Sequence, residues 1–120
     1  MTHLKSYTDL EQSKVLAKIL PLESADMYWD YNVQNHEHYP MVMDDQFDDT
    51  CVYAWSLTAL LSVFPKIGAD EPMIQKIYYA SEPTERYICM YAIDNTSSEY
   101  NNPVDACYEM IIKLNELKML

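Results

Sequence analysis

A single glycine, Gly68, is present among the 120 residues of this chain, and this scarcity limits the backbone more than any other feature of the sequence. Glycine adopts positive φ angles and lets the backbone approach a ligand at positions where a side chain would clash. Phosphate-binding loops, dinucleotide-binding turns and nucleophile elbows all need glycines at fixed spacings. None of these motifs can be built here, so we expect no nucleotide cofactor and no enzyme of those classes.

The acidic residues are unevenly placed. The formal net charge is −11, and the stretch between Lys18 and Lys66 contains no lysine or arginine. A long acidic stretch repels nucleic acid and anionic lipid and attracts cations or basic surfaces. We therefore expect a protein partner, and no binding to nucleic acid or membrane. The stretch holds eight carboxylates: Glu23, Asp26, Asp30, Glu37, Asp44, Asp45, Asp48 and Asp49.

The length suits one domain, so we predict a single domain over residues 1–120. Charged residues interrupt the N-terminal segment, and no run approaches the roughly 20 apolar residues of a membrane span. The three cysteines, Cys51, Cys89 and Cys107, are widely spaced and form no paired metal or disulfide pattern. Three reduced thiols are typical of a cytoplasmic protein, which is the location we expect.

The first half of the chain predicts one helix and one clear strand. Thr8 and Glu11 have the spacing of a capping box, and apolar residues recur at helical intervals, so we predict a helix over residues 9–20. Alternation of side chains from Met27 onward predicts a half-buried strand. A polar turn over residues 35–38, a short return strand over residues 40–43 and an acidic loop over residues 44–50 follow.

The second half predicts two helices and a hairpin. Ser56 is a good N-cap for a helix that Pro65 ends. Residues 73–80 and 86–93 are rich in tyrosine and isoleucine and predict paired antiparallel strands, with a turn over residues 81–84. Asn102 and the proline that follows it predict a last helix that reaches about residue 118. Its buried side is expected to hold Val104, Cys107, Ile111 and Leu114, with Met110 and Leu117 beside them.

The predicted element order is α-β-(β)-α-β-β-α. Because strands and helices do not alternate regularly, a doubly wound parallel sheet is not expected. The order favours an α+β fold, in which three helices pack on a mainly antiparallel sheet of three to four strands.

Two segments resemble a known group of proteins. They are Ala54-Trp55-Ser56-Leu57, followed by two leucines and a closing proline, and Asn102-Pro103-Val104-Asp105-Ala106, which leads into an apolar helix. Both are similar to short uncharacterised proteins encoded on phages and integrated mobile elements of gut bacteria. The resemblance covers the second half of the chain and implies a genomic setting without an activity.

His36 and His38, with Asp44 and Asp45 nearby in sequence, are candidate metal ligands because imidazole and carboxylate both bind divalent ions. The alternative is a solvated polar loop, and no third histidine follows at a characteristic spacing. A calcium-binding EF-hand is rejected, because its sixth and twelfth positions are Asp49 and Trp55 where glycine and glutamate are required. Because these histidines and carboxylates could bind a metal ion, a small metal- or carboxylate-dependent hydrolase is kept as a second alternative for the function.

Cys51 could act as a nucleophile with a histidine as base, but neighbouring carboxylates would raise the pKa of its thiol. We therefore name no catalytic residue.

The chain has 11 tyrosines and 2 phenylalanines. Tyrosine joins a large apolar area to a polar tip and is enriched at interfaces, although packing at the edge of the core is the alternative. We expect Tyr28, Tyr78 and Tyr87 to contribute to a contact surface. A homodimer is a further expectation if a tyrosine-rich strand edge is left unpaired.

These observations favour a small, acidic, non-enzymatic interaction protein that is encoded on a phage or mobile element. The expected contact surface consists of the eight carboxylates named above and the three tyrosines. The alternative is an acidic nucleic-acid mimic that blocks a DNA- or RNA-binding protein, which would need carboxylates in rows at phosphate-like spacing.

Overall fold

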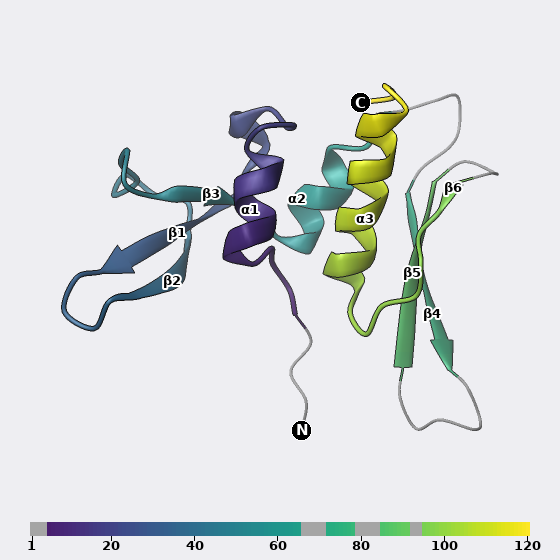
Figure 1. Ribbon diagram of the computed structural model, residues 1–120, viewed down its shortest axis with the longest axis horizontal. Helices are drawn as coiled ribbons and strands as arrows, with labels where there is room; N and C mark the ends of the chain where they lie inside the picture. Colours follow the sequence, from purple (N-terminus) through teal and green to yellow (C-terminus); the bar gives the residue numbers. More distant parts are fainter. Residues whose placement is uncertain (1–4, 66–71, 79–84, 92–94) are drawn as a thin grey trace.

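The described residues form three α-helices that stand between two antiparallel β-sheets (Figure 1). The computed structural model describes residues 5–65, 72–78, 85–91 and 95–120. The α+β class and the predicted order of elements are confirmed, and the strands divide between two sheets instead of forming one. In chain order the elements are α1 (Leu10–Leu16), the 3₁₀ turn η1 (Leu22–Ser24), β1 (Met27–Asn32), β2 (Glu37–Val42), β3 (Val52–Ala54), α2 (Leu57–Ser62), β4 (Met73–Tyr78), β5 (Glu85–Tyr91), β6 (Asn95–Thr96) and α3 (Pro103–Glu116).

Helix α1 is shorter than predicted, and a different residue caps it. Asp9, not Thr8, is the N-cap, and it forms a reciprocal capping box with Gln12. The Thr8 hydroxyl is used elsewhere: it bonds the Ser13 hydroxyl at 2.8 Å and accepts the Trp55 backbone N–H at 3.1 Å. The Thr8 hydroxyl is thus occupied by Ser13 and by Trp55, and the bond from Trp55 cannot be foreseen from the local sequence because the two residues are 47 positions apart.

The first sheet has the strand order β2-β1-β3. β2 begins at Glu37, inside the segment predicted as a turn, and β3 was not predicted at all. β3 has three residues, too few for alternation to be recognised, and it is recruited by pairing with β1. The N–H of Met43 donates to the carbonyl of Asp26 at 3.0 Å, which fixes which backbone groups of β2 face β1.

The second sheet has the strand order β4-β5-β6. β4 and β5 pair as the predicted antiparallel hairpin, with Met73 opposite Met90 and Tyr78 opposite Glu85. The predicted turn between them, like the ends of both predicted strands at residues 79–80 and 92–93, lies outside the described residues. The short strand β6 lies between the predicted hairpin and the last predicted helix, where the sequence predicted no strand.

Helices α2 and α3 begin where the sequence predicts. Ser56 caps α2 by accepting the N–H of Ala59, and Asn102 caps α3 by accepting the N–H of Asp105 at 2.9 Å. The predicted buried face of α3 is confirmed except for Leu117, which is exposed because the helix ends before it. No described helix has the length and apolar character needed to cross a membrane.

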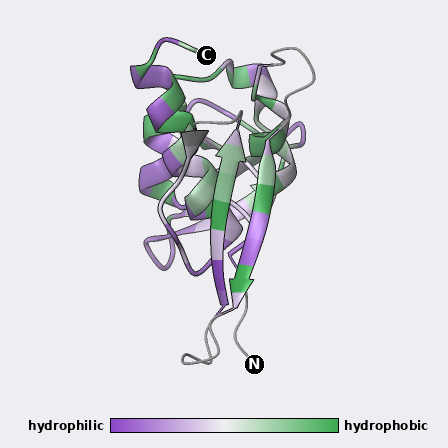
Figure 2. Cartoon of the chain, turned by 90° about the vertical axis from the view of Figure 1, so that its right-hand side faces the viewer, coloured by the Kyte–Doolittle hydropathy of each residue, from purple (hydrophilic) through white to green (hydrophobic). Residues whose placement is uncertain are grey.

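The core lies where the helices meet the inner side of β5. Its large members come from all three helices, from β5 and from the segment before α2, and they include Leu16, Trp55, Leu60, Tyr91, Met110, Ile111 and Leu114. Figure 2 shows the helices behind the second sheet with hydrophobic and hydrophilic residues alternating along them, and the hydrophobic ones named above form the packed core. The second sheet is therefore fastened to the helices through one face only.

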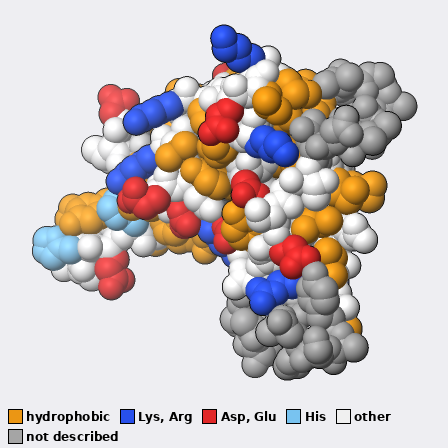
Figure 3. Space-filling model, turned by 45° about the vertical axis from the view of Figure 1, so that its right-hand side comes forward, with side chains coloured by type: hydrophobic (Ala, Val, Ile, Leu, Met, Phe, Trp, Pro, Cys, Tyr) orange, Lys and Arg blue, Asp and Glu red, His pale blue; other side chains and the backbone are white. Residues whose placement is uncertain are grey.

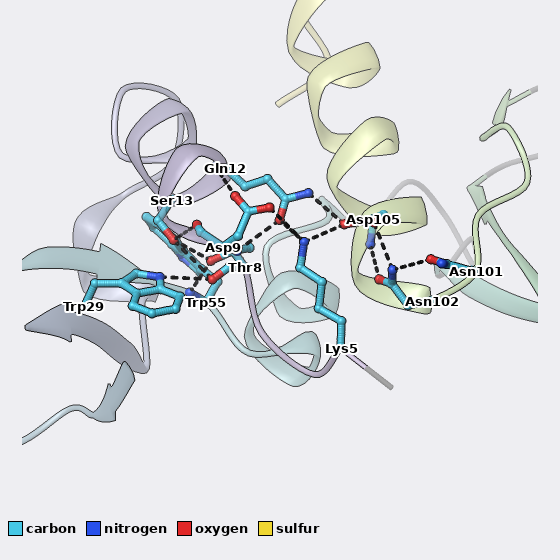
Figure 4. A network of polar contacts seen from close by, with 10 residues as sticks. All are labelled: Lys5, Thr8, Asp9, Gln12, Ser13, Trp29, Trp55, Asn101, Asn102 and Asp105. Carbon is cyan, nitrogen blue, oxygen red and sulfur yellow. Dashed lines mark hydrogen bonds and ion pairs between the residues drawn. The ribbon is translucent and has the colours of Figure 1, made fainter. Parts of the chain in front are cut away.

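The N-terminal segment is tied to α3 by a polar network (Figure 4). The Lys5 ammonium donates to Asp9 at 3.0 Å, to Gln12 at 2.8 Å and to Asp105 at 2.8 Å. All three of its N–H groups thus have acceptors, which satisfies a part-buried cation completely. This network joins the first and last helices, whose sequences are almost the whole chain apart.

Candidate acidic interface on the first sheet

The two faces of the first sheet have different surroundings. Residues that lie opposite one another in antiparallel strands project to the same face, so the registers assign the side chains. On one face, the Trp29 indole lies 5.8 Å from the Tyr7 ring and donates to the carbonyl of Thr8. That face is closed by the N-terminal segment. The opposite face carries Tyr28, Asp30, Glu37, Tyr39 and Tyr53.

The loop between β2 and β3 folds over this opposite face and is fastened there by Phe47. The Phe47 ring centroid lies 5.5 Å from that of Tyr28 and 4.4 Å from that of Tyr53. Aromatic pairs at such separations are favourable beyond the apolar area that they bury. In addition, the Tyr28 hydroxyl donates to Asp44 at 2.7 Å. The apolar side of the loop is thereby turned inward and its acidic residues are left at the surface.

Short hydrogen bonds shape the loop without neutralising it. Asp44 accepts the backbone N–H of Gln46, and Asp48 accepts that of Thr50, each two residues further along. Such side-chain bonds allow the chain to turn at positions where many proteins use glycine. The bonds from Thr50 hold the pKa of Asp48 below its usual value, so its negative charge persists to lower pH.

Cys51 lies between two carboxylates. Its Sγ is 3.8 Å from Asp30 and 3.5 Å from Asp48. Burial raises the pKa of the thiol, and the negative charges of Asp30 and Asp48 raise it further. A thiol of this kind stays protonated at neutral pH and is a poor nucleophile.

We call this surface the acidic face and define it by Asp30, Glu37, Tyr39, Asp44, Asp45, Asp48 and Asp49. Apart from half-buried Asp30, its carboxylates are exposed. The ion pairs among the described residues involve Lys5, Lys14 and Lys76, and none of them reaches a carboxylate of residues 23–49. No lysine or arginine belongs to residues 19–65. Among the described residues, the carboxylates of the acidic face therefore form no ion pair with a lysine or arginine.

Two of the predicted contact carboxylates lie outside the acidic face. Glu23 is exposed in η1. Asp26 accepts the backbone N–H of Ser56 at 2.9 Å and also accepts the Ser56 hydroxyl. Asp26 thus holds the residue that caps α2, which is a structural use of its charge.

The predicted contact tyrosines need correction. Tyr28 is fully buried under Phe47, and Tyr87 is buried on the inner side of β5, where its hydroxyl donates to Glu85. Tyr78 is 67% exposed, but it lies on the second sheet, away from the acidic face. Alternation along a strand does not reveal which of its two faces the rest of the chain covers, and this is why the first two were misassigned.

Exposed aromatic residues that the sequence did not single out lie on the β1–β2 hairpin instead. Tyr39 is 39% exposed, and its hydroxyl donates to Asp30 at 3.0 Å. Tyr31 lies on the other face, against the rings of His36 and His38. Figure 3 shows histidine and hydrophobic side chains over the hairpin that projects from the molecule. Register, which sequence alone does not supply, would have been needed to find them.

The candidate metal ligands are not brought together. His36 has a φ of 57° in the hairpin turn, and its Nδ1 lies 3.0 Å from the Tyr31 hydroxyl in a hydrogen bond. Asp44 and Asp45 follow the far end of β2, and six residues of strand span about 20 Å. Within the described ranges, no three histidine, cysteine or acidic side chains are grouped to hold a metal ion.

The chain matches no family model, no curated protein and no solved structure. The likeness to proteins of phages and mobile elements therefore stays a prediction.

Proposed function

We propose that this protein is a non-enzymatic interaction protein that binds a basic segment of a protein partner through the acidic face. The observation that carries the proposal is the set of exposed carboxylates on one sheet and its loop, without a lysine or arginine partner among the described residues. A surface of one sign concentrates ligands of the opposite sign and speeds their association.

The geometry of the acidic face favours a protein ligand over free ions. Its carboxylates are spread along β1, β2 and the loop, and the half-exposed ring of Tyr39 lies beside Asp30. Lysine and arginine side chains place charge at the end of an apolar stem, so they can contact a tyrosine ring and a carboxylate together. A peptide segment with several lysine or arginine side chains could therefore contact the carboxylates of β1, β2 and the loop at the same time.

The acidic face is also held in shape before any partner arrives. Phe47 is packed between two rings, and the turns at Asp44 and Asp48 are closed by hydrogen bonds. A preformed loop loses less conformational entropy on binding than a disordered acidic tail would.

The location of binding can be tested by nuclear magnetic resonance with an oligolysine peptide as the probe. Titration should shift the amide signals of residues 30–50 and leave those of α3 unchanged. The shifts should disappear at high salt, because exposed charges are screened beyond about 10 Å at 0.1 M ionic strength. Shifts spread evenly over the helices and the second sheet would refute the proposal, as would binding that ignores salt.

A further inference from the structure

The outer edges of β4 and β2, with six residues each, are the longest strand edges that the described part of the chain leaves unpaired. β4 is at one end of the order β4-β5-β6, and Figure 2 shows it at the margin of the second sheet. The other described edges are blunted. β3 and β6 have three and two residues, and β2 carries Pro40 at a position where the missing N–H would face outward.

The hydrogen bonds of β5 identify the backbone groups that β4 offers at this edge. The N–H and C=O of Tyr87 bond Tyr100, and the C=O of Cys89 accepts from Ser97, so these residues face away from β4. The residues between them must then bond β4, through Met73, Gln75 and Ile77. The N–H and C=O groups of Ile74, Lys76 and Tyr78 are therefore directed to the open edge.

The side chains of β4 do not prevent another strand from pairing with this edge. Lysine often protects an edge strand, but the Lys76 ammonium is directed toward the neighbouring strand β5, where it lies 2.8 Å from Glu85. Met73 and Tyr78 are 56% and 67% exposed. β4 also contains no carboxylate, although the chain carries a net charge of −11.

We propose that β4 pairs antiparallel with β4 of a second copy of this chain, which joins the two three-stranded sheets into one. In an antiparallel pair, residues whose backbone N–H and C=O groups point toward the partner strand lie opposite one another. Only registers that place Ile74, Lys76 or Tyr78 of one copy opposite one of these residues in the other copy are therefore possible. In the register centred on Gln75, that residue lies opposite the partner's Gln75, so the two amides can bond each other. Met73 then lies opposite the partner's Ile77, and Ile74 opposite the partner's Lys76. A register centred on Lys76 would instead place two ammonium groups face to face, which is unfavourable.

The distribution of charge supports a second copy as the occupant. The acidic face and β4 lie at opposite ends of the molecule, whose longest extent is 45 Å (Figure 1). Pairing through β4 keeps the two acidic faces far beyond the screening length of about 8–10 Å at physiological salt. It also places apolar residues of both outer faces, Met73 and Ile77 of each copy, in one continuous strip. The result is a dimer with a twofold axis at Gln75 and one acidic face at each end.

Cysteine cross-linking tests the register directly. In a Cys51→Ser background, Gln75→Cys places two thiols across the twofold axis, and mild oxidation should give a covalent dimer. The matched control is Met73→Cys, which is also exposed but lies opposite the partner's Ile77 and should stay monomeric on a non-reducing gel. Equal cross-linking of both variants, or cross-linking of Met73→Cys alone, overturns the proposed pairing.

The mass in solution provides the second measurement. By light scattering, the unmodified protein should be a dimer at high micromolar concentration. Gln75→Lys should be a folded monomer, because it places two ammonium groups together at the axis. Gln46→Lys, which makes the same change in the exposed acidic loop, should remain dimeric. A monomeric unmodified protein would refute the proposal and leave the β4 edge to a strand from a different protein. Neither measurement depends on binding at the acidic face.

Discussion

At the scale of single residues, Asp105 is a part-buried carboxylate that accepts hydrogen bonds from three side chains. Burial raises the pKa of its carboxyl, but hydrogen bonds from Lys5, Asn102 and Gln12 outweigh burial and hold the pKa below its usual value. A carboxylate with a lowered pKa in the folded state stabilises the fold above the pKa of the unfolded chain, about 3.9. That contribution is lost as the pH falls through the folded value.

Asp105→Asn should therefore lower the free energy of unfolding at neutral pH by about 1–3 kcal/mol, because the charge-assisted bonds from Lys5 are weakened. The difference from the unmodified protein should shrink as the pH falls below 4 and should vanish at the lowest pH. Urea denaturation across the acid range would measure this. Glu116→Gln, at the exposed end of the same helix, is the control and should leave the stability at neutral pH nearly unchanged. A constant difference at all pH values would contradict the assigned role of the charge.

The same residues show what a sequence can and cannot predict at this scale. The cap of α3 was predictable because Asn102, Pro103 and Asp105 act on backbone groups within three residues of themselves. The bond from Lys5 to Asp105 was not, because it joins positions 100 residues apart. Thr8 has the local pattern of a cap, but it loses that role to Asp9 because its hydroxyl is used by Ser13 and Trp55.

At the scale of elements, α3 has the best-defined inner face. Ile111 is fully buried, while Leu117 is 52% exposed just beyond the helix end. Ile111→Ala should lower the free energy of unfolding by about 2–5 kcal/mol, because it removes buried methyl groups and leaves a cavity. Leu117→Ala should cost much less. Chemical denaturation of both variants is the measurement, and similar losses would show that the helix faces are assigned wrongly.

The loop between β2 and β3 is the element on which the acidic face depends. Phe47→Ala should release the loop from the rings of Tyr28 and Tyr53, since dispersion and aromatic contacts hold it there. Hydrogen exchange of the backbone amides at residues 44–50 should accelerate, whereas that of α3 should not change. Unfolding would become easier by roughly 1–3 kcal/mol. Unchanged exchange in the loop would mean that its hydrogen-bonded turns are sufficient to hold it.

Elements were predictable from the sequence where periodicity was long enough, as in β1, β5 and α3. The face of β1 that is covered was not predictable. Tyr28 and Trp29 are adjacent residues of similar character, and the packing of Phe47 and Tyr7 on opposite sides decides their surroundings. The acidic loop was predicted as a segment, but its position over β1 depends on that same long-range contact. The sequence therefore predicted which acidic residues belong to the candidate site, but it did not predict how they are arranged in space.

At the scale of the whole molecule, the acidic face and the open edge of β4 lie at opposite ends of the long axis (Figure 1). The described lysines that form ion pairs belong to the N-terminal segment, α1 and β4, whereas the acidic face contains none. In the two proposals, one end of the molecule binds a basic partner and the other end pairs with a second copy of the chain. Both proposals depend on this separation, but each has an independent test.

Whether the acidic face is the recognition surface is tested by comparing the affinity of three forms of the protein for oligolysine at low and high ionic strength. The forms are the unmodified protein, Asp45→Asn/Asp49→Asn on the acidic face, and Glu11→Gln/Glu116→Gln, which removes the same charge from exposed positions elsewhere. The acidic-face variant should bind several-fold more weakly at low salt, and the control should stay close to the unmodified protein. At high salt the affinities of all three forms should converge. Equal losses in the two variants would show that only net charge matters and would contradict a recognition surface on the first sheet.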